Sequence, residues 1–150
     1  MALGDGFKDI VAVLAYAAGI IDGEGYIGIK CSEREHVQRS RSHRVYIAVS
    51  NTDELMIDFL HKHFGGSVEY KEFTNGAKPQ YRWRTSAKNA VDFLKYILPY
   101  LITKRRQAEV AIMMQESVND VNKAKGLSEE TLAFRDACMQ EIHNLNQRRC

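Results

Sequence analysis

The sequence has few of the residues on which several classes of protein depend. Its 150 residues include three cysteines and only two prolines. Cys31, Cys138 and Cys150 are odd in number, far apart and without zinc-type spacing or nearby histidine pairs. We therefore expect neither a disulfide framework nor a structural zinc site, and we expect reduced thiols in a reducing compartment.

Long apolar runs are also missing. No stretch reaches the roughly 18 uninterrupted apolar residues of a membrane span, and the first residues lack the basic-then-apolar order of a secretion signal. We expect no membrane partner and an intracellular location, in the cytoplasm, the nucleoid or an organelle, rather than secretion. No nucleotide-binding P-loop, Rossmann glycine pattern or Ser/His/Asp nucleophile set is visible either.

The net charge is only +2, from 21 basic and 19 acidic residues, so the protein is not basic as a whole. The two signs of charge are nevertheless separated along the chain. Basic residues dominate positions 26–50, 78–88 and 104–106, whereas acids gather at positions 53–58 and 129–136. This separation favours a polyanion-binding face on an otherwise balanced molecule.

Apolar periodicity predicts alternating helices and strands. Helices are predicted at residues 7–21, 53–64, from 86 to a bend or break at Pro99, 107–118 and 128–146, with Leu55, Met56, Phe59, Leu60 and His63 on one side of the second. Strands are predicted at 26–32, 44–49, 67–73 and 80–86. The run from Asp22 to Gly25 should end the first helix, and Asn75-Gly76 should form a hairpin turn.

This order predicts an α+β domain of αββαββα type followed by extra helices. Its antiparallel, saddle-like sheet should carry helices on one face only. With 45% hydrophobic residues, the chain is long enough for a real core. We expect one domain over residues 1–126 and a C-terminal helical extension of the same domain over residues 127–150.

The uncovered face of the predicted sheet carries mostly basic and polar side chains: Lys30, Ser32, Arg34, Arg44, Tyr46, Gln80, Arg82 and Arg84. A bare, twisted, basic sheet fits a DNA major groove, as in β-ribbon proteins that read DNA. The same alternation is equally typical of a solvated polar sheet face, so both interpretations stay open at this point.

One nine-residue segment stands out at the end of the first predicted helix, Ala17-Ala18-Gly19-Ile20-Ile21-Asp22-Gly23-Glu24-Gly25. Its order of small, glycine, apolar and acidic residues closely resembles the motif that names the LAGLIDADG family of homing endonucleases. The αββαββα order also resembles that family, and the motif occurs once, as in its homodimeric members. The resemblance covers about residues 7–118 and implies a homodimer.

The resemblance implies an active site shared by two subunits. Two such helices, one from each subunit, would pack through small residues and bring both Glu24 carboxylates together. The predicted dimer interface is Ala15, Ala18, Gly19 and Asp22. Crowded carboxylates favour a bound cation, so Glu24 and Gly23 are the predicted metal positions, for Mg²⁺ or another divalent cation such as Mn²⁺ or Ca²⁺. Asp22 is expected to cap or brace the helix end.

Two further catalytic positions follow from the resemblance. The stretch Leu98–Ala108 resembles the family's segment after the third helix and assigns the family's lysine to Lys104, which would orient or polarise the attacking water. An amide side chain near the end of the second strand would contact the water network, and Asn51 is the best match, with Ser50 as the alternative. Many members have aspartate at the position of Glu24, and glutamate keeps the charge but adds a methylene.

These assignments imply a metal-dependent endonuclease that cuts a long, pseudo-palindromic site in double-stranded DNA and is encoded within an intron. The predicted DNA contacts are Lys30, Ser32, Arg34, Arg39, Arg41, Arg44, Tyr46, Gln80, Arg82, Arg84, Lys88 and Lys104. A non-cleaving nucleic-acid binder on the same fold, such as an RNA-splicing maturase or a DNA-binding regulator, is the alternative, with intron RNA as a further partner. A protein–protein interaction domain is a more distant one. The target sequence does not follow from the side chains.

Overall fold

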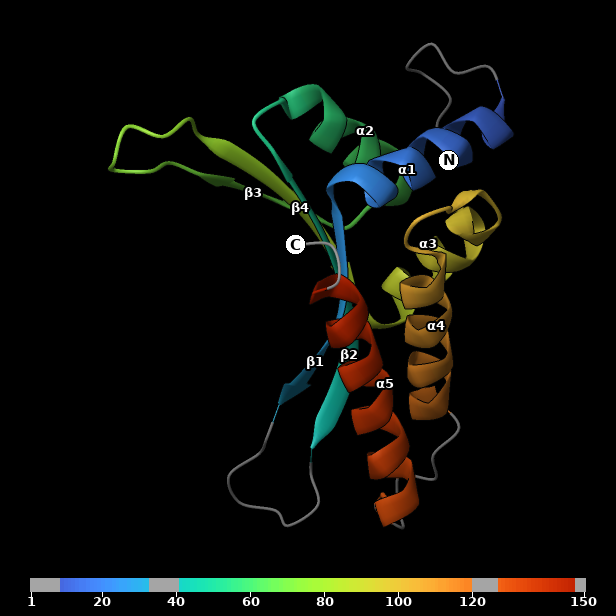
Figure 1. Cartoon of the computed structure of the whole chain (residues 1–150). Coiled ribbons are helices and arrows are strands. Elements are labelled where there is room, and N and C mark those ends of the chain that lie inside the picture. Colours follow the sequence, from blue (N-terminus) through green and yellow to red (C-terminus); the bar gives the residue numbers. More distant parts are fainter. Residues whose placement is uncertain (1–8, 33–40, 120–126, 148–150) are drawn as a thin grey trace.

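A computed structural model describes residues 9–32, 41–119 and 127–147 of the chain (Figure 1). Within these residues the order of elements is α1 (Ile10–Glu24), β1 (Gly25–Ser32), β2 (Ser42–Asn51), α2 (Glu54–Phe64), β3 (Ser67–Lys71), β4 (Gln80–Ser86), α3 (Ala87–Ile97), the 3-10 helix η1 (Leu98–Tyr100), α4 (Arg105–Asn119) and α5 (Glu129–Gln147). The predicted αββαββα order is confirmed. The predicted connection at 33–42 lies almost wholly outside the described residues.

The sheet is antiparallel throughout, with strand order β1-β2-β4-β3. Its register places the odd-numbered residues of β1, β2 and β4, and the even-numbered residues of β3, on the face that the helices cover. Ile27 pairs with Ile47, which in turn pairs with Thr85, and Val49 pairs with Trp83. All four of these apolar side chains are buried, because the helices pack over them. The even-numbered residues of β1, β2 and β4 and the odd-numbered residues of β3 therefore lie on the other, uncovered face.

The helices pack on one face of the sheet, as predicted. α1, α2 and α3 lie over β2 and neighbouring strands, while α4 and α5 lie side by side and contact β1 (Figure 1). Trp83 is fully buried at the centre, where its indole N–H donates to the carbonyl of Gly65 at 2.7 Å. The β3–β4 hairpin projects away from the helical layer. None of the helices in the described part of the chain is long and apolar enough to cross a membrane.

The first helix runs three residues further than predicted. It continues through Asp22 and Glu24 and ends at Gly25, whose N–H donates to the carbonyl of Ile21. A side chain at position 25 would place its Cβ 2.7 Å from the Cα of Ile21, so only glycine fits this close approach. The run from Asp22 to Glu24 is helical, and the turn itself is confined to Gly25.

The second and third helices begin and end largely as predicted. Asp53 caps α2 by accepting the N–H of Leu55 at 2.9 Å, and Pro99 lies in the short 3-10 helix that interrupts the chain after α3. One predicted core position is wrong. Leu55 is 77% exposed, whereas Ile57 is fully buried, so the buried side of α2 is formed by Ile57, Phe59, Leu60 and His63.

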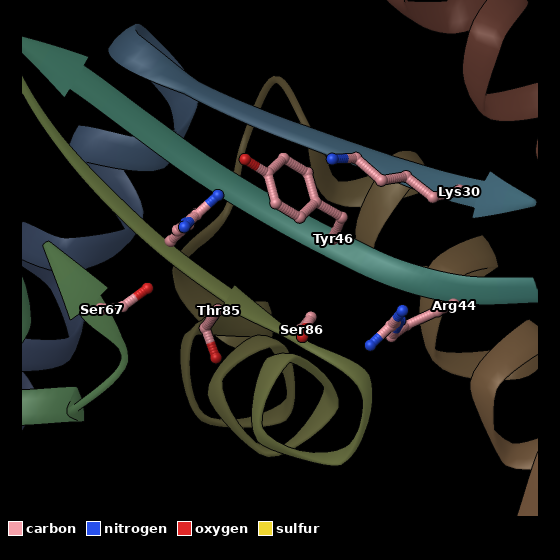
Figure 2. A pocket seen from close by; sticks show the side chains of 7 residues that line it. Lys30, Arg44, Tyr46, Ser67, Thr85 and Ser86 are labelled. Atoms are coloured by element: carbon pink, nitrogen blue, oxygen red, sulfur yellow. The ribbon is translucent and has the colours of Figure 1, made fainter. Parts of the chain in front are cut away.

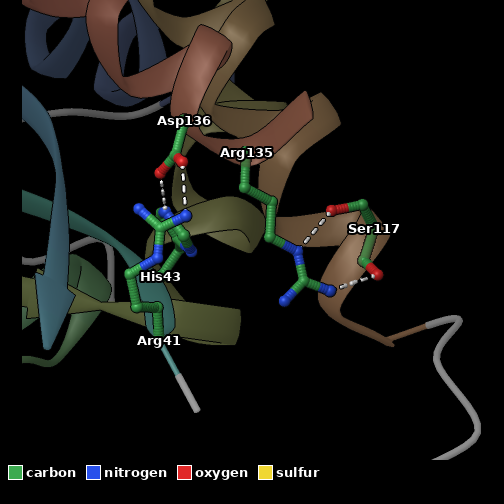
Figure 3. Close-up of polar contacts among 5 residues, drawn as sticks. All are labelled: Arg41, His43, Ser117, Arg135 and Asp136. Carbon is green, nitrogen blue, oxygen red and sulfur yellow. Dashed lines mark hydrogen bonds and ion pairs between the residues drawn. The ribbon is translucent and has the colours of Figure 1, made fainter. Parts of the chain in front are cut away.

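Polar contacts attach α5 to the sheet and to α4 (Figure 3). The carboxylate of Asp136 lies 2.8 Å from Nε2 of His43, whose side chain is fully buried, and also 2.8 Å from the guanidinium of Arg41. Buried Arg135 donates to the hydroxyl and the carbonyl of Ser117 at the end of α4. The extra C-terminal helix is therefore packed as part of the same body as the sheet.

Candidate active site and nucleic-acid interface

The C-terminal end of α1 carries an exposed carboxylate. Glu24 is the last residue of the helix, and its side chain lies in solvent beside the first residue of β1. No other residue in the described part of the chain forms a hydrogen bond or ion pair with the carboxylate of Glu24. The carboxylate of Asp22, two residues earlier, is instead engaged in hydrogen bonds within the protein.

Asp22 braces the segment that precedes α4. Its Oδ2 accepts the backbone N–H of Ile102 at 2.9 Å, and its Oδ1 accepts those of Thr103 and Lys104 at 3.1 and 2.9 Å. Partial burial by itself would raise the pKa of Asp22, but these hydrogen bonds outweigh it and hold the pKa below the usual value. The predicted bracing role of Asp22 agrees with these contacts, and both carboxylate oxygens are engaged.

Lys104 completes the same connection from the other side. Its ammonium donates to the carbonyl of Ile21 at 2.9 Å and to that of Gly25 at 2.5 Å. Lys104 is only 9% exposed, so its positive charge is held directly beneath the end of the helix that carries Glu24. This position suits the predicted catalytic role, and the same contacts leave little of Lys104 at the surface. Its contact with a DNA phosphate stays a prediction.

The side chains at this end of α1 fit a divalent cation only in part. Glu24 offers the hard carboxylate oxygens that Mg²⁺ and Ca²⁺ prefer, and Gly23 is exposed next to it. Among the described residues, no three His, Cys, Asp or Glu side chains are grouped as metal ligands would be. Glu24 is therefore a single candidate carboxylate ligand, and a cation bound there would need water or groups from outside this chain to complete its coordination.

One face of α1 is exposed and built of small residues. Ala12, Ala15, Gly19 and Gly23 follow one another at helical spacing on it, and a Cβ added at Gly19 or Gly23 would meet no atom within 4 Å. We call these four residues the α1 face. The predicted interface residues Ala15 and Gly19 belong to it. Ala18 does not, because its side chain is fully buried in the protomer core.

The amide predicted to serve the water network is partly engaged. Oδ1 of Asn51 accepts the N–H of Asp53 at 2.8 Å, in the turn that leads into α2. The alternative, Ser50, is at an even position on the uncovered face and pairs with Arg82. Val49 pairs with Gly25, the residue that directly follows α1. Ser50 is the next residue of β2 after Val49.

The uncovered sheet face carries most of the residues predicted to contact DNA. The register places on it Lys30, Ser32, Arg44, Tyr46, Gln80, Arg82 and Arg84. Arg34 and Arg39 lie outside the described residues. Lys30, Arg44, Tyr46 and Arg84 line a shallow hollow together with Ser67, Thr85 and Ser86 (Figure 2). The basic side chains thus converge on one surface, although they come from three strands.

Tyr46 is part of this surface, but its ring is almost completely covered by neighbouring side chains. The ring is only 7% exposed, with the ammonium of Lys30 3.7 Å from its centroid and the guanidinium of Arg82 at 5.8 Å. Figure 2 shows the Lys30 side chain pointing toward the ring. The phenol therefore has little surface left for a DNA contact, and it holds the two cations by their attraction to the ring face.

Two other basic predictions are corrected by the structure. Arg41 is paired with Asp136 on the helix-covered side of the sheet, away from the basic face. The cluster at positions 104–106 is structural as well. Arg105 donates to the carbonyls of Leu98 and Pro99, and Arg106 lies 2.7 Å from Glu141 of α5. Lys88, at the start of α3, remains exposed and lies 3.0 Å from Asp92.

Three further residues of the uncovered face were not among the predicted DNA contacts: Tyr26, Glu69 and Lys71. Tyr26 lies over Gly28, where an added Cβ would come within 2.5 Å of the phenol oxygen. Glu69 forms an ion pair with Arg84. The predicted Asn75-Gly76 hairpin turn could have indicated the face of the last two. Pairing residues 67–71 with 80–84 across this turn places Glu69 and Lys71 on the same face as Arg82 and Arg84.

Comparisons with known proteins agree with this architecture. The family model described as LAGLIDADG endonuclease matches residues 17–113, starting at the first residue of the nine-residue motif. No curated protein sequence matches the chain. The homing endonuclease I-CvuI, in complex with the I-CreI target, is similar in structure, with a TM-score of 0.72 and 19% identity over 90% of this chain and 82% of that one.

Two further solved structures share the fold. The archaeal intron-encoded homing endonuclease I-Vdi141I, complexed with DNA, has a TM-score of 0.75 and 14% identity over 91% of this chain and 86% of that one. The LAGLIDADG homing endonuclease I-SmaMI, bound to cleaved DNA, has a TM-score of 0.59 and 20% identity over 90% of this chain but only 50% of that one. At these identities the likeness concerns the fold.

Proposed function

Because the chain belongs to the LAGLIDADG endonuclease family, we propose that it is a site-specific homing endonuclease that cuts both strands of double-stranded DNA in a divalent-metal-dependent reaction. The observation that carries the proposal is the exposed Glu24 carboxylate at the end of α1, a helix end that Asp22 and Lys104 fix to the segment before α4. The strand β1, which begins directly after Glu24, contributes to the basic, uncovered face of the sheet.

The proposed active unit is a homodimer joined through the α1 face. The small residues Ala15 and Gly19 leave room for a second helix to approach closely, and the contact would bring two Glu24 carboxylates together. Ile102, which is 83% exposed, is tied to Asp22 and lies beside the same helix end, where a partner would cover it. A chain about twice as long, I-SmaMI, matches this one over half its length, which is consistent with two such units acting together.

Each residue of the site has a distinct proposed role. Glu24 would hold the divalent cation, which when bound supplies activation of water and stabilisation of the leaving 3′ oxygen. Lys104 keeps a positive charge beneath this point and so favours the negative charge that develops on the phosphate. The amide nitrogen of Asn51, whose oxygen is engaged by Asp53, would help to orient the attacking water.

The proposed DNA-binding surface is the uncovered face of the sheet. Contacts of Arg44, Lys88 and Lys71 with phosphates would provide salt-dependent affinity, whereas Lys30, Gln80 and Arg82 project from strands and would reach base edges in the major groove. A pair of such faces, related by the dimer axis, accounts for a long pseudo-palindromic target. We propose further that the gene lies in an intron and that the joined exons contain this target.

The test is cleavage of the joined-exon DNA in Mg²⁺ by the wild type and by Glu24→Gln. We expect the variant to bind the duplex with unchanged affinity but to lose cleavage by a factor of at least about 100, because the cation loses its carboxylate. Glu54→Gln removes an equally exposed carboxylate from α2 and should cut normally. Undiminished cleavage by Glu24→Gln would refute the metal assignment.

A non-cleaving role in RNA splicing is the second proposal that the same fold allows. It is less favoured because Glu24 and Lys104 are both in place at the helix end. The two functions separate in one experiment, in which the protein is given either the joined-exon duplex or the unspliced intron RNA. Cleavage of the duplex supports the endonuclease, whereas splicing of the RNA without cleavage of the duplex supports the maturase.

A further inference from the structure

The uncovered sheet face contains one acidic side chain among its described strand residues. The even-numbered positions of β1 and β2 and their counterparts on β3 and β4 contribute five cations: Lys30, Arg44, Lys71, Arg82 and Arg84. Glu69, in the middle of β3, is the exception. A carboxylate on a surface that faces phosphates lowers the affinity for any DNA, so its presence calls for a more specific explanation.

Glu69 is bound to one particular arginine. The residue directly opposite Glu69 on β4 is Arg82. The carboxylate of Glu69 nevertheless forms its ion pair with Arg84, which is two residues further along β4 and lies opposite Ser67. Arg82 lies over the ring of Tyr46 instead. The side chains of Glu69 and Arg84 are 46% and 38% exposed, so the pair is open to solvent and contributes little to stability.

The pair presents acceptors and donors side by side. A guanidinium donates two parallel hydrogen bonds to O6 and N7 of guanine, and a carboxylate accepts a hydrogen bond from N4 of cytosine. These three groups form the major-groove edge of one G·C base pair. An A·T pair offers a methyl group and only one donor in a different place, so it does not match both side chains at once.

We propose that Glu69 is a specificity-determining residue and that, together with Arg84, it reads one G·C base pair in each half-site. Arg84 contacts the guanine and Glu69 contacts the paired cytosine. The ion pair holds the guanidinium in one orientation before DNA binds, and it keeps Arg84 from pairing with phosphates of unrelated DNA. This assignment rests on the proposed function, since it requires the uncovered face to lie in the major groove.

The test is selection of bound duplexes from a randomised DNA library, without added divalent metal so that bound DNA is not cut. The full-length wild type is compared with Glu69→Gln, Arg84→Gln and Glu72→Gln. The last is the matched control, because Glu72 follows the same strand but accepts a hydrogen bond from Tyr70 at 3.0 Å and is not on the basic face. Thermal unfolding of each variant verifies that it is folded, and Glu69→Thr, which also removes the carboxylate, is the substitute if Glu69→Gln is not.

We expect Glu69→Gln and Arg84→Gln to lose the preference for G·C at the same single position of each half-site. The discrimination there should fall by roughly tenfold or more, while the other positions are unchanged. Glu72→Gln should select the wild-type sequence. The proposal is overturned if Glu69→Gln selects the wild-type sequence, if it weakens all positions equally, or if the two variants alter different positions. A wild type without any sequence preference would refute the proposed function itself.

Discussion

Asp22 and Lys104 are joined in both directions although 82 residues separate them in the chain. The carboxylate of Asp22 accepts the backbone N–H of Lys104 at 2.9 Å, and the ammonium of Lys104 donates to the carbonyl of Ile21, beside Asp22. This connection fixes the end of α1 to the segment before α4. The direction in which Glu24 points therefore depends on residues that are remote in sequence.

Replacing Asp22 with asparagine should destabilise the protein and reduce its sensitivity to acid. Hydrogen bonds to a charged acceptor are lost, so we expect the free energy of unfolding to fall by about 1–3 kcal/mol at pH 7. The folded state lowers the pKa of Asp22, so its contribution is complete at neutral pH and disappears as the pH falls below about 4 toward the lowered pKa. Urea unfolding of both proteins from pH 7 to pH 3 measures this difference.

The difference between wild type and Asp22→Asn should therefore shrink in acid. Asp136 acts in the same direction, because the contacts with His43 and Arg41 outweigh its partial desolvation and lower its pKa, so some acid sensitivity remains in the variant. Asp92→Asn, at a half-exposed position in α3 where the carboxylate pairs with Lys88 on the surface, is the control and should unfold like the wild type. Equal stability of Asp22→Asn and wild type at pH 7 would contradict the bracing role.

Replacing Lys104 with methionine should damage both stability and cleavage. Methionine retains the apolar stem but leaves the carbonyls of Ile21 and Gly25 without the ammonium, which we expect to lower the free energy of unfolding by about 1–3 kcal/mol. Cleavage of bound DNA in a single turnover should fall further than stability explains. Lys95→Met removes a lysine that pairs with Glu116 on the surface and should leave both properties unchanged. Normal cleavage by Lys104→Met would remove Lys104 from the site.

Adding a methyl group at Gly25 and at Gly23 should have very different effects. At Gly25 the new Cβ would lie 2.7 Å from the Cα of Ile21 and 2.8 Å from its carbonyl oxygen, so the backbone has to move. We expect Gly25→Ala to lower the free energy of unfolding by about 1–3 kcal/mol. Gly23→Ala meets no neighbour of its own chain within 4 Å and lies in a helix, where alanine is preferred, so the fold of the single chain should be unaffected or stabilised, and any loss should be confined to association through the proposed α1 face. Similar unfolding curves for the two variants would contradict the close approach at Gly25.

Replacing Gly19 with leucine tests the proposed dimer through the α1 face. A Cβ at Gly19 meets nothing within its own protomer, so the fold should be retained, but a second helix could no longer approach. Light scattering should give twice 17.1 kDa for the wild type and 17.1 kDa for the variant. Ala137→Leu, at an exposed position of α5, should remain dimeric. A wild type that is itself monomeric would refute the shared active site.

Local sequence patterns were enough to predict the order of elements, because each pattern reflects contacts within one strand or helix. The strand predicted at 44–49 has Val45, Ile47 and Val49 buried on its covered side, and the helix predicted at 53–64 begins at Glu54 with Asp53 as its cap. Pro99 marked the break after α3. The exposed Leu55 escaped prediction, because the apolar spacing of the helix did not distinguish Leu55 from Ile57 as the residue that packs on the core.

The nine-residue motif likewise indicated the family and the acidic residue at its end without any coordinates. Its small residues are visible in sequence because they share one helical period. Their partners are not visible: Ala18 and Gly19 are neighbours in the motif, yet one is buried in the protomer and the other exposed. Only the packing of α1 against the core separates the two.

The charges show the same division most clearly. Composition predicted three basic stretches, but tertiary contacts assign Arg105 and Arg106 to structural roles, turn Arg41 toward Asp136 and place Glu69 beside Arg84. Coulombic and hydrogen-bonding partners are chosen by distance in space, and the chain order does not contain that distance. Residue types and spacing thus predicted which chemistry this protein could perform, and long-range packing decided which individual side chains remain available to perform it.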